Sequence, residues 1–324
     1  VTTIDPVSKK KSKAVLWETN YPYLPHQFPL WQMAPNLGKG VKVAIIDTGT
    51  QYSIPQIERC LVALGLNYEH VDFIILTHIH LDHAGGASAL MALCANAQLV
   101  VHPKGARHMV DPSKLITGAS AVYGEVEFNK LYGHIAPIDS TRIIQPKDGD
   151  DLDFSGRRLT FIDTPGHANH HHCIIDHQTN SVFTGDTLGV GYKALRNDAH
   201  AFVAPTTTPV QFNPAALHES IDKVMSHNPS MLYLTHYSAV KPSAKIIAGL
   251  HEQIDDFVML TQKAADSDDD FVTVLSHDIN EYLVRRCLNE LDNVDEATAR
   301  HWIKLDAGLN AQGLAFWWQH KRVL

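Results

Sequence analysis

The chain lacks the features that mark a membrane-spanning, secreted or nucleic-acid-binding protein. It contains no run of about 18 apolar residues, the length that a helix needs to cross a bilayer. No secretory signal is visible, although a chain that starts with Val1 can already have lost one. The formal net charge is −8, and the one basic cluster, at residues 9–13, is interpreted as a solvated tail. Because a nuclease needs a phosphate-binding surface, we expect neither a nucleic acid nor a membrane as partner.

Cysteine is also scarce, and no serine nucleophile is apparent. The four cysteines are widely spaced and form no CxxC pair: Cys60, Cys94, Cys173 and Cys287. Most lie in apolar surroundings, which predicts buried free thiols and a reducing, cytoplasmic compartment. The Gly-x-Ser-x-Gly turn of serine hydrolases is absent as well.

Strands alternate with helices along most of the chain, which indicates a layered α/β architecture. At 324 residues the chain can form one large domain or two smaller ones. Apolar runs predict strands at 42–47, 71–76, 99–102, 159–162, 181–183 and 231–234. Helical spacing and start signals predict helices at 53–66, at 87–95, from Asn213 onward and at 243–265.

Four metal-binding side chains lie within six residues, directly after the strand predicted at 71–76: His78, His80, Asp82 and His83. Loops at the carboxyl ends of strands are where α/β folds collect ligands. Imidazole and carboxylate together suit zinc, iron or manganese. The alternative is a histidine-rich surface loop without metal, but chance rarely delivers this order and spacing.

Three later residues supply the ligands that such a site would still need. His167, Asp186 and His236 each follow an apolar strand-like run, so each again lies where a strand ends and a loop begins. The sequence therefore predicts a site assembled from several strand ends.

These motifs, together with Ile46-Asp47-Thr48-Gly49, resemble the metallo-β-lactamase superfamily from about Val41 to His236. The resemblance implies an αββα sandwich of two mixed sheets flanked by helices. Beyond it, apolar residues at helical spacing predict a helical C-terminal extension. We therefore expect a catalytic domain at 1–265 and a helical extension at 266–324.

The resemblance also implies a dinuclear centre of two divalent ions, with zinc expected first and iron or manganese as alternatives. Its ligands divide as follows: His78, His80 and His167 for one ion, Asp82, His83 and His236 for the other, and Asp186 as the bridge. Two ions roughly 3.5–4 Å apart repel each other, so a shared carboxylate and hydroxide help to neutralise them. Asp47 is expected to hydrogen-bond the ligands from outside, which orients imidazoles.

Asp186 stands where true β-lactamases generally carry cysteine, so the resemblance points away from antibiotic hydrolysis and toward glyoxalase II, lactonases and related metal-dependent hydrolases. We expect hydrolysis of an ester, thioester or lactone in a small-molecule substrate by a metal-bridging hydroxide, with Asp82 passing a proton to the leaving group. Gly189 argues against the lactonases, which commonly carry a tyrosine there, and no basic pair for glutathione is recognisable.

Two other classes remain open. Persulfide dioxygenases of this superfamily are similar and use a single iron, whose ligands here would be His78, His167 and Asp186. A non-catalytic scaffold is the second alternative, but degraded motifs would be expected there, and all seven ligand positions are intact.

Several features outside the ligand motifs have two interpretations each. Residues 103–150 are either surface decoration or a lid over the metals. Tyr192 and Tyr237 either donate to a developing oxyanion or simply pack. One of His170, His171 and His172, most simply His171, is expected to support the ligands, because neighbours in a strand point to opposite faces.

The predicted helices after Phe271 carry a bulky apolar stripe, with Trp302, Phe316, Trp317 and Trp318. Large apolar patches rarely face water, so these side chains must pack on the core or on another chain. We expect the segment to wall the substrate pocket and to contribute to a homodimer.

Overall fold

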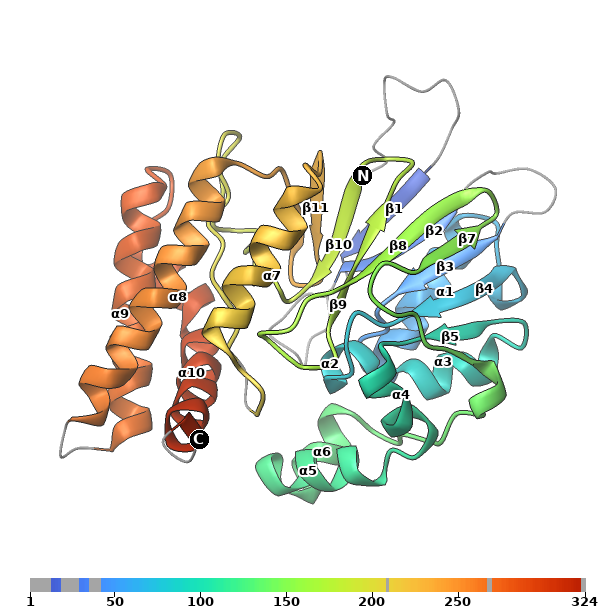
Figure 1. Cartoon of the computed structure of the whole chain (residues 1–324), viewed down its shortest axis with the longest axis horizontal. Helices are drawn as coiled ribbons and strands as arrows, with labels where there is room; N and C mark the ends of the chain where they lie inside the picture. The colour runs from blue at the N-terminus through green and yellow to red at the C-terminus, as the bar shows by residue number, and fades with distance from the viewer. Residues whose placement is uncertain (1–12, 19–28, 35–41, 208–209, 267–269, 322–324) are drawn as a thin grey trace. The chain divides into compact units, whose positions relative to one another are not determined.

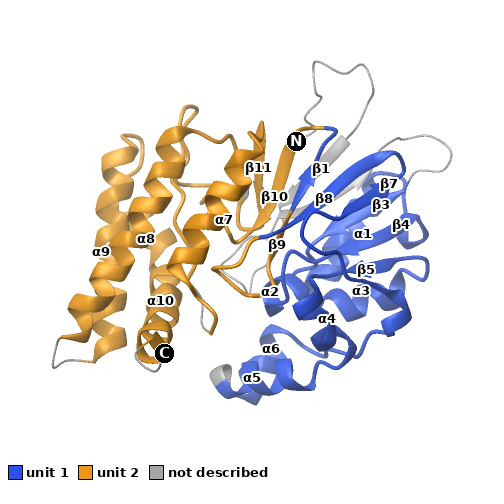
Figure 2. Cartoon of the chain, in the orientation of Figure 1, with its two compact units in different colours: residues 1–163, 174–178 blue, residues 164–173, 179–324 orange. Residues whose placement is uncertain are grey.

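The computed structural model describes residues 13–18, 29–34, 42–207, 210–266 and 270–321 (Figure 1). These residues contain two six-stranded sheets and the helices that flank them. The chain divides into two compact units, Val1–Asp163 with Ile174–Gln178 and Thr164–Cys173 with Thr179–Leu324 (Figure 2). The observed architecture is the expected sandwich of two sheets flanked by helices.

The first sheet runs in the order β1-β2-β3-β4-β5-β6. Its strands are β1 (Lys13–Glu18), β2 (Pro29–Ala34), β3 (Val43–Ile46), β4 (Val71–Ile75), β5 (Gln98–Val100) and β6 (Ile143–Ile144). The β1–β2 and β2–β3 pairs are antiparallel, and the remaining pairs are parallel. The sheet is therefore mixed, as predicted, and the carboxyl ends of β3 and β4 lie at the same edge.

Helices cover the parallel part of this sheet and form its core. They include α1 (Ile54–Ala63), α3 (Ala87–Leu93) and α4 (Pro103–Val110). Pro55 lies in the first turn of α1, where its missing N–H costs nothing. Ile57 and Leu61 of α1 are buried in one cluster with Ile45 of β3 and Ile74 of β4. This packing holds the two strands whose ends carry the first ligand motif.

The second sheet runs in the order β12-β11-β10-β9-β8-β7. Its strands are β7 (Asp151–Phe154), β8 (Arg157–Asp163), β9 (His172–Asp176), β10 (Ser181–Gly185), β11 (Met231–Leu234) and β12 (Ser238–Val240). The β10–β11 pair is parallel, whereas β7–β8 and β11–β12 are antiparallel. The ring of Phe154 meets Phe73 of β4 edge-on, with centroids 6.0 Å apart.

A fully buried ion pair ties β8 to β9. The guanidinium of Arg157 donates to both oxygens of Asp176, through Nε at 2.8 Å and through the second terminal nitrogen. The Asp176 carboxylate also accepts from the backbone N–H of Gln178. Such a pair adds little net stability, but removing one partner would leave the other charge buried and uncompensated.

The described chain after β12 is helical, as predicted for the C-terminal extension. It contains α8 (Ala244–Ala265), α9 (Phe271–Glu290) and α10 (Glu296–Lys321), and α9 packs against both α8 and α10. Helix α7 (Pro214–Ser226) lies between β10 and β11 in the sequence. Asn213 caps α7 by accepting from the N–H of Ala216, and Ser243 caps α8 in the same way. The helical nature of the extension is thus confirmed, and the proposed domain boundary at 265 stays a prediction.

Residues 103–150 are mostly helical and not an open loop. They form α4, α5 (Ser113–Tyr123) and α6 (Glu125–Leu131). Phe128 and Ile135 are buried together with Leu81, which lies in the short helix α2 (Leu81–Ala84). The segment therefore supports the helix that carries Asp82 and His83. Single turns of 3-10 helix complete the fold at η1 (Gln51–Ser53), η2 (Tyr68–His70) and η3 (Ser140–Arg142).

No helix among the described residues has both the length and the apolar character needed to cross a membrane.

Candidate metal centre

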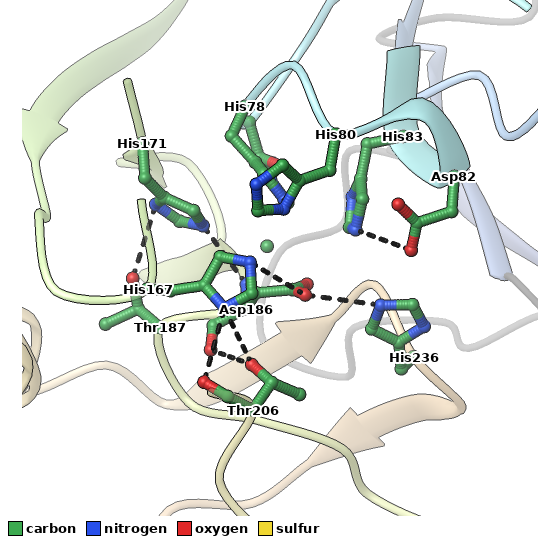
Figure 3. A network of polar contacts seen from close by, with 12 residues as sticks. His78, His80, Asp82, His83, His167, His171, Asp186, Thr187, Thr206 and His236 are labelled. Atoms are coloured by element: carbon green, nitrogen blue, oxygen red, sulfur yellow. Dashed lines mark hydrogen bonds and ion pairs between the residues drawn. The ribbon is translucent and has the colours of Figure 1, made fainter. Parts of the chain in front are cut away.

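The first four predicted ligands converge at the carboxyl end of β4. His78 follows the strand, and His80 is the residue that precedes α2. The Nε2 atom of His78 lies 3.0 Å from Nδ1 of His80, and the ring centroids of His78 and His83 are 3.9 Å apart (Figure 3). The Nε2 atom of His83 lies 3.5 Å from Oδ2 of Asp82. Four side chains of the kinds that bind transition metals therefore lie close together in one segment.

Asp47, at the end of β3, holds this segment from outside, as expected. Its Oδ2 atom is 2.8 Å from Nδ1 of His83, and its Oδ1 accepts from the backbone N–H of Thr77 at 2.8 Å. Asp47 is buried. Because an ionised carboxylate only accepts, His83 must carry its proton on Nδ1, which leaves the Nε2 lone pair for an ion.

Thr77 extends the influence of Asp47 to His78. The Thr77 hydroxyl donates to Asp47 Oδ2 at 2.9 Å, so its oxygen can accept from Nδ1 of His78, 3.1 Å away. His78 then keeps its proton on Nδ1 and turns an unprotonated Nε2 toward His80. Sequence reasoning gave Thr77 no role, although its place beside His78 was a signal that could have found it.

The Asp47-Thr48-Gly49 turn hydrogen-bonds to the same segment. Asp47 has a φ of 55° and Gly49 a φ of 62°. The left-handed conformation of a non-glycine residue costs about 1–3 kcal/mol. Thr48 offsets this cost, because both its N–H and its hydroxyl donate to the carbonyl of His83, at 2.7 and 2.8 Å. The turn therefore places the Asp47 carboxylate and anchors α2 at once.

The other three predicted ligands come from loops that follow β8, β10 and β11. The Oδ2 atom of Asp186 lies 3.6 Å from Nε2 of His167 and 3.3 Å from Nε2 of His236 (Figure 3). All three side chains are buried. The Asp186 carboxylate thus faces two imidazoles, which is the arrangement that a shared ligand requires.

Thr206 orients His167, and sequence reasoning missed it. Its hydroxyl donates to the carbonyl of Asp186 at 3.1 Å. The Nδ1 atom of His167 lies 3.1 Å from that hydroxyl oxygen and 3.3 Å from the Thr206 carbonyl. Since these partners accept, Nδ1 carries the proton and Nε2 keeps its lone pair. Thr206 is distant in sequence from both ligands and belongs to no motif, so no local signal marks it.

His171 supports Asp186, in agreement with its predicted role. Its Nε2 atom accepts from the backbone N–H of Asp186 at 3.1 Å, and its Nδ1 lies 2.8 Å from the Thr164 hydroxyl. His171 is fully buried. A doubly protonated ring could not accept this hydrogen bond, so the environment favours neutral His171 with its proton on Nδ1.

The predicted ligands fall into three groups that could each hold a metal ion. Within each group, one candidate ligand atom per residue lies within 4.8 Å of the others: His78, His80 and His167; His78, His83 and Asp186; Asp82, His83 and His236. The donor set is imidazole and carboxylate, which fits zinc and its first-row neighbours. The residues therefore fit the metal chemistry that the motifs imply.

Tyr192 is a packed tyrosine and not an oxyanion donor. Its hydroxyl donates to Oδ2 of Asp306 in α10 at 2.6 Å, and the side chain is fully buried. Burial and the nearby Asp306 carboxylate raise the pKa of Tyr192 well above its usual value. The ring of Tyr237 stacks on Tyr192 and meets Trp302 edge-on.

A sequence model of the family described as the metallo-beta-lactamase superfamily matches residues 38–236, more than half of the chain. The chain belongs to this superfamily. The match contains all seven predicted ligands, so the metallo-beta-lactamase motifs and the observed groups of donors coincide.

Similar proteins include a metallo-beta-lactamase fold-containing protein of Sulfurisphaera tokodaii. It is 28% identical over 178 residues, which are 54% of this chain and 63% of that protein. An atrochrysone carboxyl ACP thioesterase of Pseudocercospora fijiensis is 29% identical over 175 residues, 53% of this chain and 41% of the relative. The matched regions thus span less than two thirds of either relative.

A solved structure of a metallo-beta-lactamase family protein from Thermus thermophilus has the same fold. It is 19% identical, gives a TM-score of 0.65 and covers 95% of this chain and 93% of its own. At this identity the likeness establishes the superfamily fold alone.

Proposed function

We propose that this superfamily member is a metal-dependent hydrolase of esters, thioesters or lactones. The observation that carries the proposal is the Asp186 carboxylate, which faces both His167 and His236 at 3.6 and 3.3 Å. A shared carboxylate is what two adjacent cations need. A relative named as an acyl carrier protein thioesterase supports the choice of an acyl substrate.

Two divalent ions would be held by the seven predicted ligands. His78, His80 and His167 would hold the first, Asp82, His83 and His236 the second, and Asp186 would serve both. We expect zinc, with iron or manganese as alternatives. When bound, such ions supply a water nucleophile at neutral pH and polarise the substrate carbonyl.

Asp82 is the residue to which we assign proton transfer. Its side chain is 37% exposed, whereas that of His83 beside it is fully buried. Asp82 can therefore meet a substrate while His83 stays shielded from water. A carboxylate there can carry a proton to the leaving group as the acyl bond breaks.

The decisive experiment combines metal analysis of the purified protein with a panel of lactones, thioesters and phosphodiesters. We expect two ions per chain and turnover of an acyl substrate. A single iron per chain with oxygen consumption would overturn the proposal in favour of a persulfide dioxygenase that uses His78, His167 and Asp186.

The role of Asp82 is tested with Asp82→Asn on the substrate that the panel identifies. We expect kcat to fall by about 100-fold or more, with an unchanged melting temperature. Asp198→Asn is the matched control, because Asp198 is exposed and lies outside the ligand groups. Equal activity of Asp82→Asn and the control would remove Asp82 from the mechanism.

We also propose that the C-terminal helices wall the substrate pocket and contribute to a homodimer. Trp302 packs on Tyr237, and Trp317 meets Phe212 edge-on at 6.1 Å, so part of the aromatic stripe is covered within the chain. Truncation after Asp266 should lower activity and change the oligomeric state by size-exclusion chromatography. A soluble, monodisperse and fully active truncated protein would overturn both roles.

A reducing, cytoplasmic setting belongs to the same proposal. It is supported by the four cysteines, all of which are free and buried. Detection of the native protein in an oxidising compartment would contradict it.

A further inference from the structure

Helices α7 and α8 present matching pairs of histidine and aspartate. His218 and Asp222 are four residues apart on α7, and His251 and Asp255 are four residues apart on α8. The pairs interact crosswise. The Nε2 atom of His218 lies 3.1 Å from Oδ1 of Asp255, and Nε2 of His251 lies 3.1 Å from Oδ1 of Asp222.

This crosswise pairing decides the protonation of both rings. Each carboxylate accepts a hydrogen bond from Nε2 of the opposite histidine, so each Nε2 carries a proton. The neutral rings then have their lone pairs on Nδ1. The two Nδ1 atoms face each other only 2.6 Å apart, with the ring planes 8° from parallel. Two lone pairs at this distance repel each other unless a proton, which makes the contact a hydrogen bond, or a metal ion lies between them.

We propose that His218 and His251 bind a transition-metal ion, zinc first, at a site separate from the predicted catalytic centre. Both Nδ1 atoms would be ligands, and water would complete the coordination. Asp222 and Asp255 would act as the carboxylates that commonly orient metal-bound histidines and raise their basicity. Their two negative charges balance those of a divalent ion.

The burial of the cluster suits such an ion. The two histidine side chains are 26% and 25% exposed, whereas the aspartates are 72% and 73% exposed. An ion can therefore enter from solvent and still be held by partly shielded nitrogens. Zinc bonds to nitrogen at about 2.0–2.1 Å, so tetrahedral coordination would place the Nδ1 atoms about 3.3 Å apart. The side chains need to separate by about 0.7 Å, a small rotation for partly exposed rings.

The ion would act by joining two helices. Helix α7 also holds the loop before His167, because the N–H of Asn213 donates to Gly166 and the hydroxyl of Ser220 donates to Pro165, at 2.8 and 2.5 Å. A link from α7 to α8 would thus stabilise the support of this loop. We expect its effect on thermal stability to exceed its effect on turnover.

The test uses the whole 324-residue chain after the predicted catalytic metal sites have been filled. Zinc is titrated in competition with a chromophoric chelator, and cobalt absorption is recorded in parallel. We expect the wild type to bind one further ion, and His218→Ala and His251→Ala to lose it. Asp255→Asn should lower the affinity for that ion by about 10-fold or more. His227→Ala is the matched control, because His227 is an exposed histidine at the end of α7.

Thermal melting provides a second readout. Zinc added after the predicted catalytic sites are filled should raise the melting temperature of the wild type and of His227→Ala. It should not raise that of His218→Gln or His251→Gln. These glutamine variants keep a polar side chain and replace the alanine variants if those fold poorly. Equal stoichiometry and equal zinc response in wild type and both pair variants would overturn the proposal. Unchanged imidazole NMR titrations of His218 and His251 in excess zinc would show that only a proton occupies the gap, and would overturn it as well.

Discussion

The two regions that supply the predicted ligands differ in how they are built. In the first, His78 to His83 come from one short segment, and the supporting Asp47 and Thr77 end two neighbouring parallel strands. In the second, His167, Asp186 and His236 come from three separate loops, and their support comes from the distant Thr206 and His171. The first region depends on local chain geometry, whereas the second depends on loops that tertiary packing must bring together.

Asp186→Ala should have the largest effect on this comparison, because it removes the carboxylate that faces both His167 and His236. Loss of a supporting residue costs about 10–100-fold in metal affinity, so loss of this ligand should exceed about 100-fold. Elemental analysis and competition with chelators measure the loss. Retention of two ions at wild-type affinity would show that the ligands of the two regions do not share Asp186.

Leu81→Ala should be the next largest change, and it acts on the first region through packing. Leu81 is 6% exposed and is buried with Phe128 and Ile135. Truncation of a buried leucine costs about 2–5 kcal/mol in the free energy of unfolding. Urea denaturation measures this cost. Val126→Ala is the control, because Val126 is 84% exposed on α6, and a similar loss in both variants would mean that α5 and α6 do not support α2.

Asp47→Asn and Thr206→Val compare the supports of the two regions directly. Asp47→Asn should lower metal affinity by about 10–100-fold, since it disturbs His83 and, through Thr77, His78. Thr206→Val should cost about 10-fold or less, because the Thr206 carbonyl still accepts from His167 at 3.3 Å. Competition with a chelator, measured for both variants, shows which substitution lowers metal affinity more. A larger loss for Thr206→Val would reverse the comparison.

The smallest difference concerns the buried cysteine thiols of the two units, which should have similar reactivity. Burial raises the pKa of Cys94 in the first unit and of Cys173 in the second to about 12. Both should resist thiol reagents in the native protein at pH 8 and react after unfolding. Because the unfolded thiols ionise near 9.0 while the folded ones stay neutral, the free energy of unfolding should fall as the pH rises above that value. Rapid labelling of either native thiol would show that its region opens readily.

Regular elements with a clear pattern were predicted well. The strand at 231–234 was placed to the residue, and the capped starts of α7 and α8 were placed at Asn213 and Ser243. In each case the signal is local, either an unbroken apolar run or a side chain that caps a helix. The strands at 29–34 and 238–240 were missed, because short strands are defined by their partners more than by their own residues.

The helices α5 and α6, which pack near the first ligand motif, were also not predicted from local sequence patterns. The sequence at 103–150 left open whether the segment was decoration or a lid, because start and stop signals such as Pro103, Gly124 and Gly133 do not show what the helices pack against. The structure resolves it into helices that pack against Leu81. That contact joins residues about 50 positions apart, and no local pattern records it.

By itself, the sequence determined the superfamily, the layered fold and the chemistry of the donors, because spacing at strand ends and side-chain type are local properties. Only the tertiary structure decided which nitrogen of His83 and of His167 is protonated and which side chains hold the proton there. Asp47 acts on His83 across 36 positions and Thr206 on His167 across 39. The protonation of an imidazole follows from the partner of its other nitrogen. Those partners are chosen by packing, so they are known only once the chain has folded.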